Sequence, residues 1–291
     1  MMDFYLNTMK KKVRNVEEKI IHFSKCIGMG VATRSPYDNI FHCCVQKTAS
    51  QWFQEVFNDK IFFQNTGLIV ERYWKTGLRQ ESYKSVPLRR VASALYIIHP
   101  DYLVIPKPKR YKTFFVTRDP RDLVVSFYFS TKYSHQLIAY IPTMRTALAS
   151  LSIGEGLKYA IDALDELGVF EAQRSWLDTE DEQHKIFRYE DLARDNRTFL
   201  RQLLNYLKVE ISEENFNLLY NRHTYENYSK GRPQGKEDIN SHYRKGVSGD
   251  WKDYFDEDVM KHFRNVTDDL VEALDYNADE SLEKLQPTHG S

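Results

Sequence analysis

The 291-residue sequence has few of the features that mark a secreted, membrane or metal-binding protein. It contains three cysteines, of which Cys43 and Cys44 are adjacent and would point to opposite faces of a strand. This sparse set predicts no disulfide framework and no metal site, and it indicates a reduced, cytoplasmic protein. The longest apolar runs, such as 94–98 and 123–125, are too short to span a bilayer. Charged residues at 17–19 interrupt the basic N-terminus, so we expect no secretory signal there.

The chain also lacks an excess of charge of either sign. Lysine plus arginine number 41 and aspartate plus glutamate number 41, so no overall field favours nucleic acid or an anionic membrane as a partner. Any anion would have to be bound by a local cluster of cations. Hydrophobic residues make up 42% and charged residues 28%, which is typical of a globular protein. No repeat or linker divides the chain, so we expect a single domain over 1–291.

Strand-like and helix-like segments alternate along the sequence. Apolar spacing predicts an N-terminal helix over 8–27. Short apolar runs predict strands at 39–45, 94–98, 113–117 and 184–188. Further helices are expected from about residue 51, from 120 to about 131, and within 155–180, 196–222 and 256–274. This alternation predicts an α/β fold, with a central parallel β-sheet flanked by helices and ligands at the carboxyl ends of the strands.

One loop at that edge has the layout of an anion-binding turn. In VQKTASQWF (45–53), a lysine and two hydroxyl residues lie between a predicted strand and the start of a helix. Backbone N–H groups and the positive end of the helix dipole would face a ligand there. The glycines of the nucleotide-binding P-loop, G-x-x-x-x-G-K-[ST], are missing. Hydroxyl residues also cap many helices, so this loop alone decides little.

Two further loops carry cations. In TRDPRDLVVSFYF (117–129), Arg118 follows a strand, where it could bind a phosphate or pair with an aspartate. In YRKGVSGDWKDYF (243–255), Arg244 and Lys245 precede Gly246, a residue that lets the backbone approach a ligand closely. Two separated cation clusters would suit a ligand that bears phosphates at two ends.

Together these segments resemble the motifs of the cytosolic-type sulfotransferases, which transfer a sulfuryl group from 3′-phosphoadenosine 5′-phosphosulfate (PAPS). QKTASQW (46–52) is similar to the family's P-K-S-G-T-T-W loop, and TRDPRDLVVSFYF resembles its R-N-x-x-D-x-x-x-S-x-Y segment. FRYEDLARD (187–195) resembles the Y-E-D-L segment, and the third loop is very close to R-K-G-x-x-G-D-W-K-N-x-F. The four motifs occur in the family order, and the resemblance runs from about residue 40 to 275. It implies a P-loop-like phosphosulfate-binding loop in the α/β fold.

The resemblance implies a site for PAPS and for its product, adenosine 3′,5′-bisphosphate (PAP), without a metal. The residues that would bind the phosphosulfate are Lys47, Thr48, Ala49, Ser50 and Gln51, and Trp52 would stack on the adenine. Those that would bind the 3′-phosphate are Arg118, Ser126, Arg244, Lys245 and Gly246. The base would be bound by Tyr189, with Thr224 and Tyr225 packing on it.

The resemblance also implies two catalytic residues. Lys47 would stabilise the charge that develops on the leaving phosphate oxygen. His99, which follows a predicted strand, would be the general base, because an imidazole titrates near neutrality. The sequence departs from the family at Ile97, where the family has a lysine, and at Ala49, where it has a glycine. Glu71 is a competing base, since carbohydrate-modifying relatives use a glutamate after the first loop, but we favour an exposed helical glutamate there.

We therefore predict a sulfotransferase that moves the sulfuryl group of PAPS to a hydroxyl or amine of a small-molecule acceptor. The many aromatic residues suggest an aromatic, heterocyclic or cationic acceptor. The alternatives are a P-loop-type nucleotide kinase and a non-catalytic nucleotide-binding module. The missing G-K-[ST] disfavours the kinase, and the presence of both His99 and Lys47 disfavours the binding module. The acceptor, the choice between O- and N-sulfation, and the oligomeric state stay open.

Overall fold

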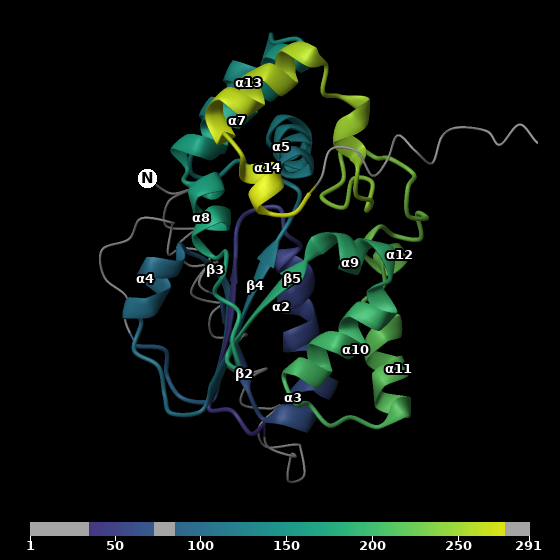
Figure 1. Ribbon diagram of the computed structural model, residues 1–291. Coiled ribbons are helices and arrows are strands. Elements are labelled where there is room, and N and C mark those ends of the chain that lie inside the picture. Colours follow the sequence, from purple (N-terminus) through teal and green to yellow (C-terminus); the bar gives the residue numbers. More distant parts are fainter. Residues whose placement is uncertain (1–34, 73–84, 277–291) are drawn as a thin grey trace, which may run out of the picture.

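The fold is built around one sheet of parallel strands. A computed structural model describes residues 35–72 and 85–276. The sheet has the strand order β2-β3-β1-β4-β5, and every pairing is parallel. The strands are β1 (Asn39–Cys44), β2 (Ile69–Arg72), β3 (Arg90–Tyr96), β4 (Tyr111–Thr117) and β5 (His184–Arg188). Figure 1 shows them at the centre with helices on both sides, which confirms the predicted α/β fold.

Helices bury both faces of this sheet. One face packs against α2 (Ser50–Asn58), α3 (Lys60–Thr66), α10 (Asn196–Tyr206) and α11 (Glu213–Arg222). The other packs against α5 (Pro120–Phe129), α7 (Ile153–Glu166), α8 (Val169–Ser175) and α13 (Glu257–Thr267). The adjacent residues Cys43 and Cys44 belong to different cores, as the alternation of side chains along a strand predicts. All six residues of β1 are buried, as expected for a central parallel strand.

Shorter elements connect these layers. They are α4 (His99–Val104), α6 (Ile141–Ala149), α9 (Tyr189–Arg194), α12 (Tyr225–Tyr228), α14 (Leu270–Ala273), a π-helix at Ser130–Ser134 and a 3₁₀-helix at Asp250–Asp253. The predicted helix over 8–27 lies outside the described residues.

Several predicted boundaries are wrong. The strand predicted at 94–98 runs from Arg90 to Tyr96, so it ends before Ile97. The single helix predicted over 256–274 is two helices, because the backbone at Asp268 turns to a φ of 55° and ends α13. The sequence predicts neither β2 nor α3. The four residues of β2 are too few to show a periodic pattern.

The sheet brings the candidate loops to one edge. Because all strands run in the same direction, the segments that follow them meet at the same end. Residues 45–49 follow β1, Arg118 follows β4, and Tyr189 follows β5. Strands β1 and β4 are neighbours, so the first two of these segments lie side by side.

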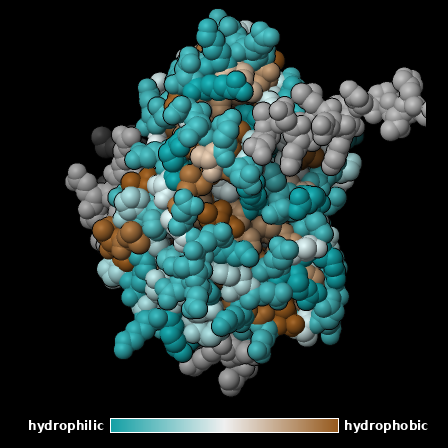
Figure 2. Space-filling view, in the orientation of Figure 1, coloured by the Kyte–Doolittle hydropathy of each residue, from teal (hydrophilic) through white to brown (hydrophobic). Residues whose placement is uncertain are grey.

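The surface seen in Figure 2 is mainly hydrophilic, with separate hydrophobic patches. One patch lies over α4, where Leu103 and Val104 are 58% and 67% exposed. Within residues 35–72 and 85–276, no helix combines the length and the apolar character needed to cross a membrane.

Candidate functional site

The loop between β1 and α2 has an unusual backbone. Lys47 and Ala49 have φ values of 68° and 61°, in the left-handed region that glycine prefers. Ala49 therefore adopts the conformation that the family's glycine would allow. The Thr48 hydroxyl donates a hydrogen bond to the Val45 carbonyl (2.8 Å), and this buried bond stabilises the turn. In this described segment no side chain caps the amino end of α2, so its first N–H groups are available to an anion.

Three cations from three loops converge beside this turn. An Nη atom of Arg118 donates to the Lys47 carbonyl (2.9 Å), and Lys47 and Arg244 line one small cavity together with Ser126. Burial, and then the charges of Arg118 and Arg244, lower the pKa of Lys47 to about 7. The structure thus joins the first, second and third loops, as the sequence predicts.

Arg118 is held in a fixed orientation but keeps one free donor. Its side chain is buried, and its guanidinium lies 4.1 Å from the centre of the Tyr189 ring. Its backbone N–H donates to the side-chain oxygen of Gln173 (3.0 Å). The buried Nε of Arg118 has no hydrogen-bond partner in the part of the chain described. A buried donor without a partner is costly, so an anion bound here would remove that cost.

The third loop supplies cations that are already paired with carboxylates. Arg244 contacts Glu237 and Asp250, and Lys245 contacts Asp250 and, at 3.3 Å, Asp253. These carboxylates raise the pKa of Lys245. Both cations therefore stay charged and held in place near neutral pH.

Gly246 is required by its surroundings. Its φ is 72°, and a Cβ built there would lie 2.3 Å from a ring carbon of Tyr225. The Tyr225 hydroxyl in turn donates to the Tyr243 carbonyl (2.9 Å), which holds the ring against the loop. The structure therefore brings the predicted residues Gly246 and Tyr225 into direct contact.

The proposed adenine side is assembled around Trp52. Its indole N–H donates to the carbonyl of His223 (2.8 Å), the residue before Thr224. Thr224 caps α12, whose first residue is Tyr225. The indole is buried and packs against Phe53 and Phe199, so much of the ring belongs to the hydrophobic core. In the same helix Gln51 is exposed, and Ser50 makes a hydrogen bond of 3.0 Å with the Tyr96 hydroxyl.

The structure does not bring His99 to this group. Its ring lies 4.8 Å from the centre of Trp176 and 6.2 Å from that of His184. His184 is the first residue of β5 and pairs with Thr113 of β4. Arg118 lies five residues beyond Thr113, which is roughly 16 Å along the strand at about 3.3 Å per residue. The cause is that β3 ends at Tyr96, and the chain then turns away from the cofactor edge before it reaches His99.

Glu71 lies in a strand rather than in the helix that the sequence indicates. It belongs to β2 at the side of the sheet, and its carboxylate pairs with Arg90 at 2.7 Å. The interpretation of Glu71 as an exposed helical residue is therefore wrong about the element.

Several residues of the site are not among those predicted from the sequence. Asp122 accepts hydrogen bonds from the N–H groups of Gly249 (2.6 Å) and Trp251 (2.9 Å), and so ties α5 to the third loop. It is the aspartate of the R-N-x-x-D pattern, which could have indicated this role. Burial, and then the nearby charge of Lys47, lowers the pKa of His135 and of His242. No local motif marks either histidine.

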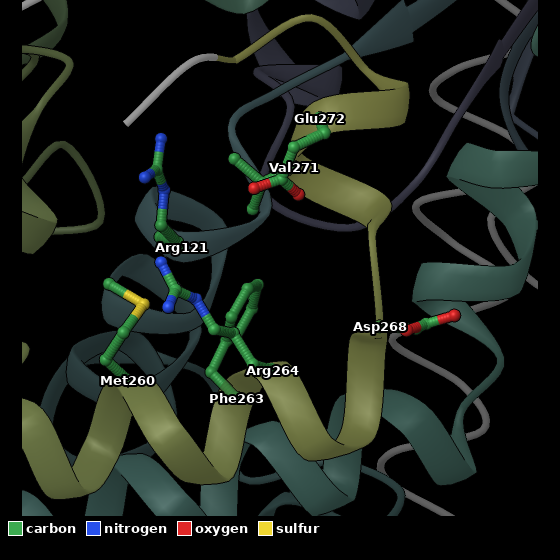
Figure 3. A pocket seen from close by; sticks show the side chains of 7 residues that line it. All are labelled: Arg121, Met260, Phe263, Arg264, Asp268, Val271 and Glu272. Carbon is green, nitrogen blue, oxygen red and sulfur yellow. The ribbon is translucent and has the colours of Figure 1, made fainter. Parts of the chain in front are cut away.

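Another small pocket lies between α5, α13 and α14. Figure 3 shows Arg121 and Arg264 reaching into it from two helices, beside Met260 and Phe263. Arg121 is already paired with Asp119 at 2.7 Å, so we assign this pocket a structural part only. Among the described residues, no group of three or more histidine, cysteine, aspartate or glutamate side chains is placed to hold a metal ion.

Known proteins resemble this chain in sequence. The chain matches the model of the sulfotransferase domain over residues 37–284. It belongs to the sulfotransferase family. An amine sulfotransferase of Oryctolagus cuniculus is 22% identical over 252 residues, which cover 79% of this chain and 79% of that protein. A 3-beta-hydroxysteroid sulfotransferase of Cavia porcellus is 26% identical over 55% of this chain and 57% of its own length. This sulfotransferase is thus an enzyme of the predicted transferase class.

Solved structures resemble its fold. Mouse sulfotransferase SULT7A1 complexed with PAP has a TM-score of 0.51 and 17% identity, and the match covers 84% of this chain and 87% of that one. Retinol dehydratase in a complex with retinol and PAP also has a TM-score of 0.51, with 16% identity, 84% coverage of this chain and 83% of its own. These likenesses confirm the sulfotransferase fold that the motifs predict.

Proposed function

We propose that this sulfotransferase uses PAPS as the donor and sulfates a small molecule that carries a hydroxyl or amine. The observation that carries the proposal is that Lys47 and Arg244 line one cavity and that Arg118, from a third loop, donates to the Lys47 carbonyl beside it. PAPS, when bound, supplies an activated sulfuryl group between its 5′-phosphate and the acceptor. The two PAP-bound structures that share the fold support this donor.

The residues fit such a donor chemically. The amino end of α2 and Lys47 suit the 5′-phosphosulfate, because N–H groups, a helix dipole and a cation all favour an anion. Arg118, with its free Nε, and Arg244 suit the 3′-phosphate together with Ser126. Lys47 would stabilise negative charge on the leaving phosphate oxygen, since a fixed cation in a dry site lowers the barrier without a metal.

The acceptor would have an apolar body. Large apolar side chains are exposed beside the cavity-lining segment 129–134 and in the loop before Arg244: Tyr133, Leu137, Ile138, Tyr140 and Ile239. Exposed apolar groups gathered near a site are typical of a ligand-binding surface. The solved complex of retinol dehydratase with retinol is an example of the fold with an apolar alcohol, and the relative from Oryctolagus cuniculus is named for amines.

The base predicted from the sequence, His99, gains no support from its position. A general base must come within hydrogen-bond reach of the acceptor proton, and the ring of His99 lies against Trp176 and His184. Burial and the charges of His184 and Lys107 also lower the pKa of His99. The role of general base stays a prediction for His99.

Two measurements test the proposed function. Calorimetric titration with PAP, 5′-AMP and ATP should give the tightest binding for PAP, and loss of the 3′-phosphate should cost about 1.5–3 kcal/mol. Incubation with sulfur-labelled PAPS and a panel of alcohols, phenols and amines should transfer label to some of them. A preference for ATP over PAP would favour the kinase alternative, and PAP binding without any transfer would favour the binding module.

A further inference from the structure

A cluster of buried polar side chains lies behind the proposed adenine side. Nε2 of His223 lies 3.2 Å from a carboxylate oxygen of Asp59, and the two side chains are 9% and 8% exposed. The other ring nitrogen, Nδ1, makes a hydrogen bond with the hydroxyl of Tyr228. Because a carboxylate only accepts, Nε2–H of His223 donates to Asp59, and in the neutral ring Nδ1 accepts from Tyr228. We call these three side chains the polar cluster.

The polar cluster joins two segments that are distant in the sequence. Asp59 is the residue between α2 and α3. His223 directly follows α11, and Tyr228 is the last residue of α12. The hydrogen bonds of the polar cluster therefore fix the segment 223–228 relative to α2, the helix that carries Trp52.

The backbone of His223 is also the point at which Trp52 is held. The His223 carbonyl accepts hydrogen bonds from the indole N–H of Trp52 (2.8 Å) and from the side-chain amide of Asn196 (2.8 Å). Thr224 and Tyr225, which the motif resemblance assigns to the adenine, are the next two residues of the chain. A shift of His223 would therefore move the anchor of the indole and the start of this segment together.

We propose that His223 is a positioning residue for recognition of the donor's base: held by Asp59 and Tyr228, it sets the position of Trp52 and of the segment 224–225 against the adenine. This inference rests on the proposed function. Groups that recognise a ligand must be held within a fraction of an ångström by the hydrogen bonds behind them. The phosphates are bound by other groups, at the amino end of α2 and in the cation-bearing loops, so loss of the polar cluster should affect the base far more than the phosphates.

The first test compares two ligands that have the same phosphates and different bases. Calorimetry on the full chain gives the dissociation constants of PAP and of uridine 3′,5′-bisphosphate, and the parent should prefer PAP. This preference should fall about tenfold in His223→Ala and about threefold in Tyr228→Phe, which keeps the ring that stacks on Tyr243. Affinity for the uridine ligand should change little, which also shows that the variants fold. Asp59 keeps its ion pair with Arg222 (3.1 Å) when His223 is removed.

The matched control is another histidine that pairs with an aspartate. His262 on α13 pairs with Asp162 on α7 (2.7 Å), on the other face of the sheet, so His262→Ala should keep the preference of the parent. An equal loss of affinity for both ligands in His223→Ala, or an unchanged preference in both variants, would overturn the inference. If His223→Ala does not fold, the same ratio in Tyr228→Phe decides.

Two results for the parent separate this inference from the proposed function. A parent that prefers PAP to 5′-AMP but does not distinguish the two bases would overturn the inference alone. A parent that binds PAP no more tightly than 5′-AMP would instead overturn the proposed function.

The second test follows the indole of Trp52 directly. Its N–H resonance is recorded by NMR and assigned from its loss in Trp52→Phe. In His223→Ala this resonance should shift, because the carbonyl that accepts from it moves. The indole N–H of Trp176, which donates to the Ile97 carbonyl (3.0 Å), should keep its position. A Trp52 resonance that does not shift would overturn the inference.

Discussion

The buried charge of Lys47 makes donor binding depend on pH. Burial and two arginines lower the pKa of Lys47 to about 7 in the free protein. Bound phosphates favour the charged amine, so the pKa of Lys47 in the complex lies above that value. For a group whose pKa rises on binding, affinity is greatest below the free pKa and falls as pH rises through it. PAP binding should therefore weaken steadily in mildly alkaline solution.

The size of the effect follows from the fraction of Lys47 that is uncharged. With a free pKa of about 7, the dissociation constant for PAP should rise about eightfold from pH ~7.5 to pH ~8.5, or about 1.2 kcal/mol. At pH ~8, binding should take up about 0.9 proton, since nearly every free Lys47 is then uncharged. Burial and the charge of Lys47 lower the pKa of His135 and His242, so these two histidines contribute little in this range.

Calorimetry in two buffers of different ionisation enthalpy measures both quantities. Lys47→Met should bind PAP more weakly and should lose the pH slope and the proton uptake. The free variant should also be more stable, because the lysine pKa is lower in the folded than in the unfolded chain and folding at neutral pH works against its charge. The same pH slope in Lys47→Met, or equal affinity at both pH values in the parent, would refute the reasoning.

Substitutions of the other site residues test which groups these residues contact. Arg118→Ala and Arg244→Ala should each weaken the binding of PAP by about 1.5–3 kcal/mol and the binding of 5′-AMP much less. An equal loss for both ligands would mean that neither arginine binds the 3′-phosphate. Gly246→Ala should reduce PAP affinity, because the new methyl would lie 2.3 Å from a Tyr225 ring carbon, and Tyr225→Leu should restore part of the loss if that contact is the cause. Asp122→Ala should lower the free energy of unfolding by about 2–4 kcal/mol, as it frees two loop N–H groups, and a denaturant curve that matches the parent would exclude this role.

The parts of the site that are local in sequence could be predicted. The strand, turn and helix around Lys47 lie within twenty residues, and their order alone indicates an anion-binding turn. Arg118 could be placed at the same edge because parallel strands end together. Motif resemblance then added Arg244, which no rule of strand order could have placed beside Lys47.

His99 shows where local prediction fails. An apolar run from residue 94 to 98 suggests that the strand continues to His99, but the ladder with β1 ends at Tyr96. The three residues from Tyr96 to His99 are enough to move the side chain away from that strand end, because the ladder stops and the chain turns into α4. Tyr96, whose hydroxyl reaches Ser50, occupies the strand end that the sequence assigns to the histidine.

Contacts between distant segments do not follow from residue spacing or strand order. Asp122 and Gly249 are 127 residues apart, and their hydrogen bond exists only once α5 and the third loop are packed together. The same holds for Lys47 and His242, which come from opposite ends of the described chain and share one cavity. No spacing rule connects such pairs.

The two groups that meet in that cavity, Lys47 and His242, are electrostatically coupled. Without a donor, burial lowers the pKa of both groups, and nearby cations lower it further: Lys47 acts on His242, and Arg118 and Arg244 act on Lys47. A bound phosphosulfate would reverse both effects with one set of negative charges. Binding of the donor should therefore raise the pKa of both groups together.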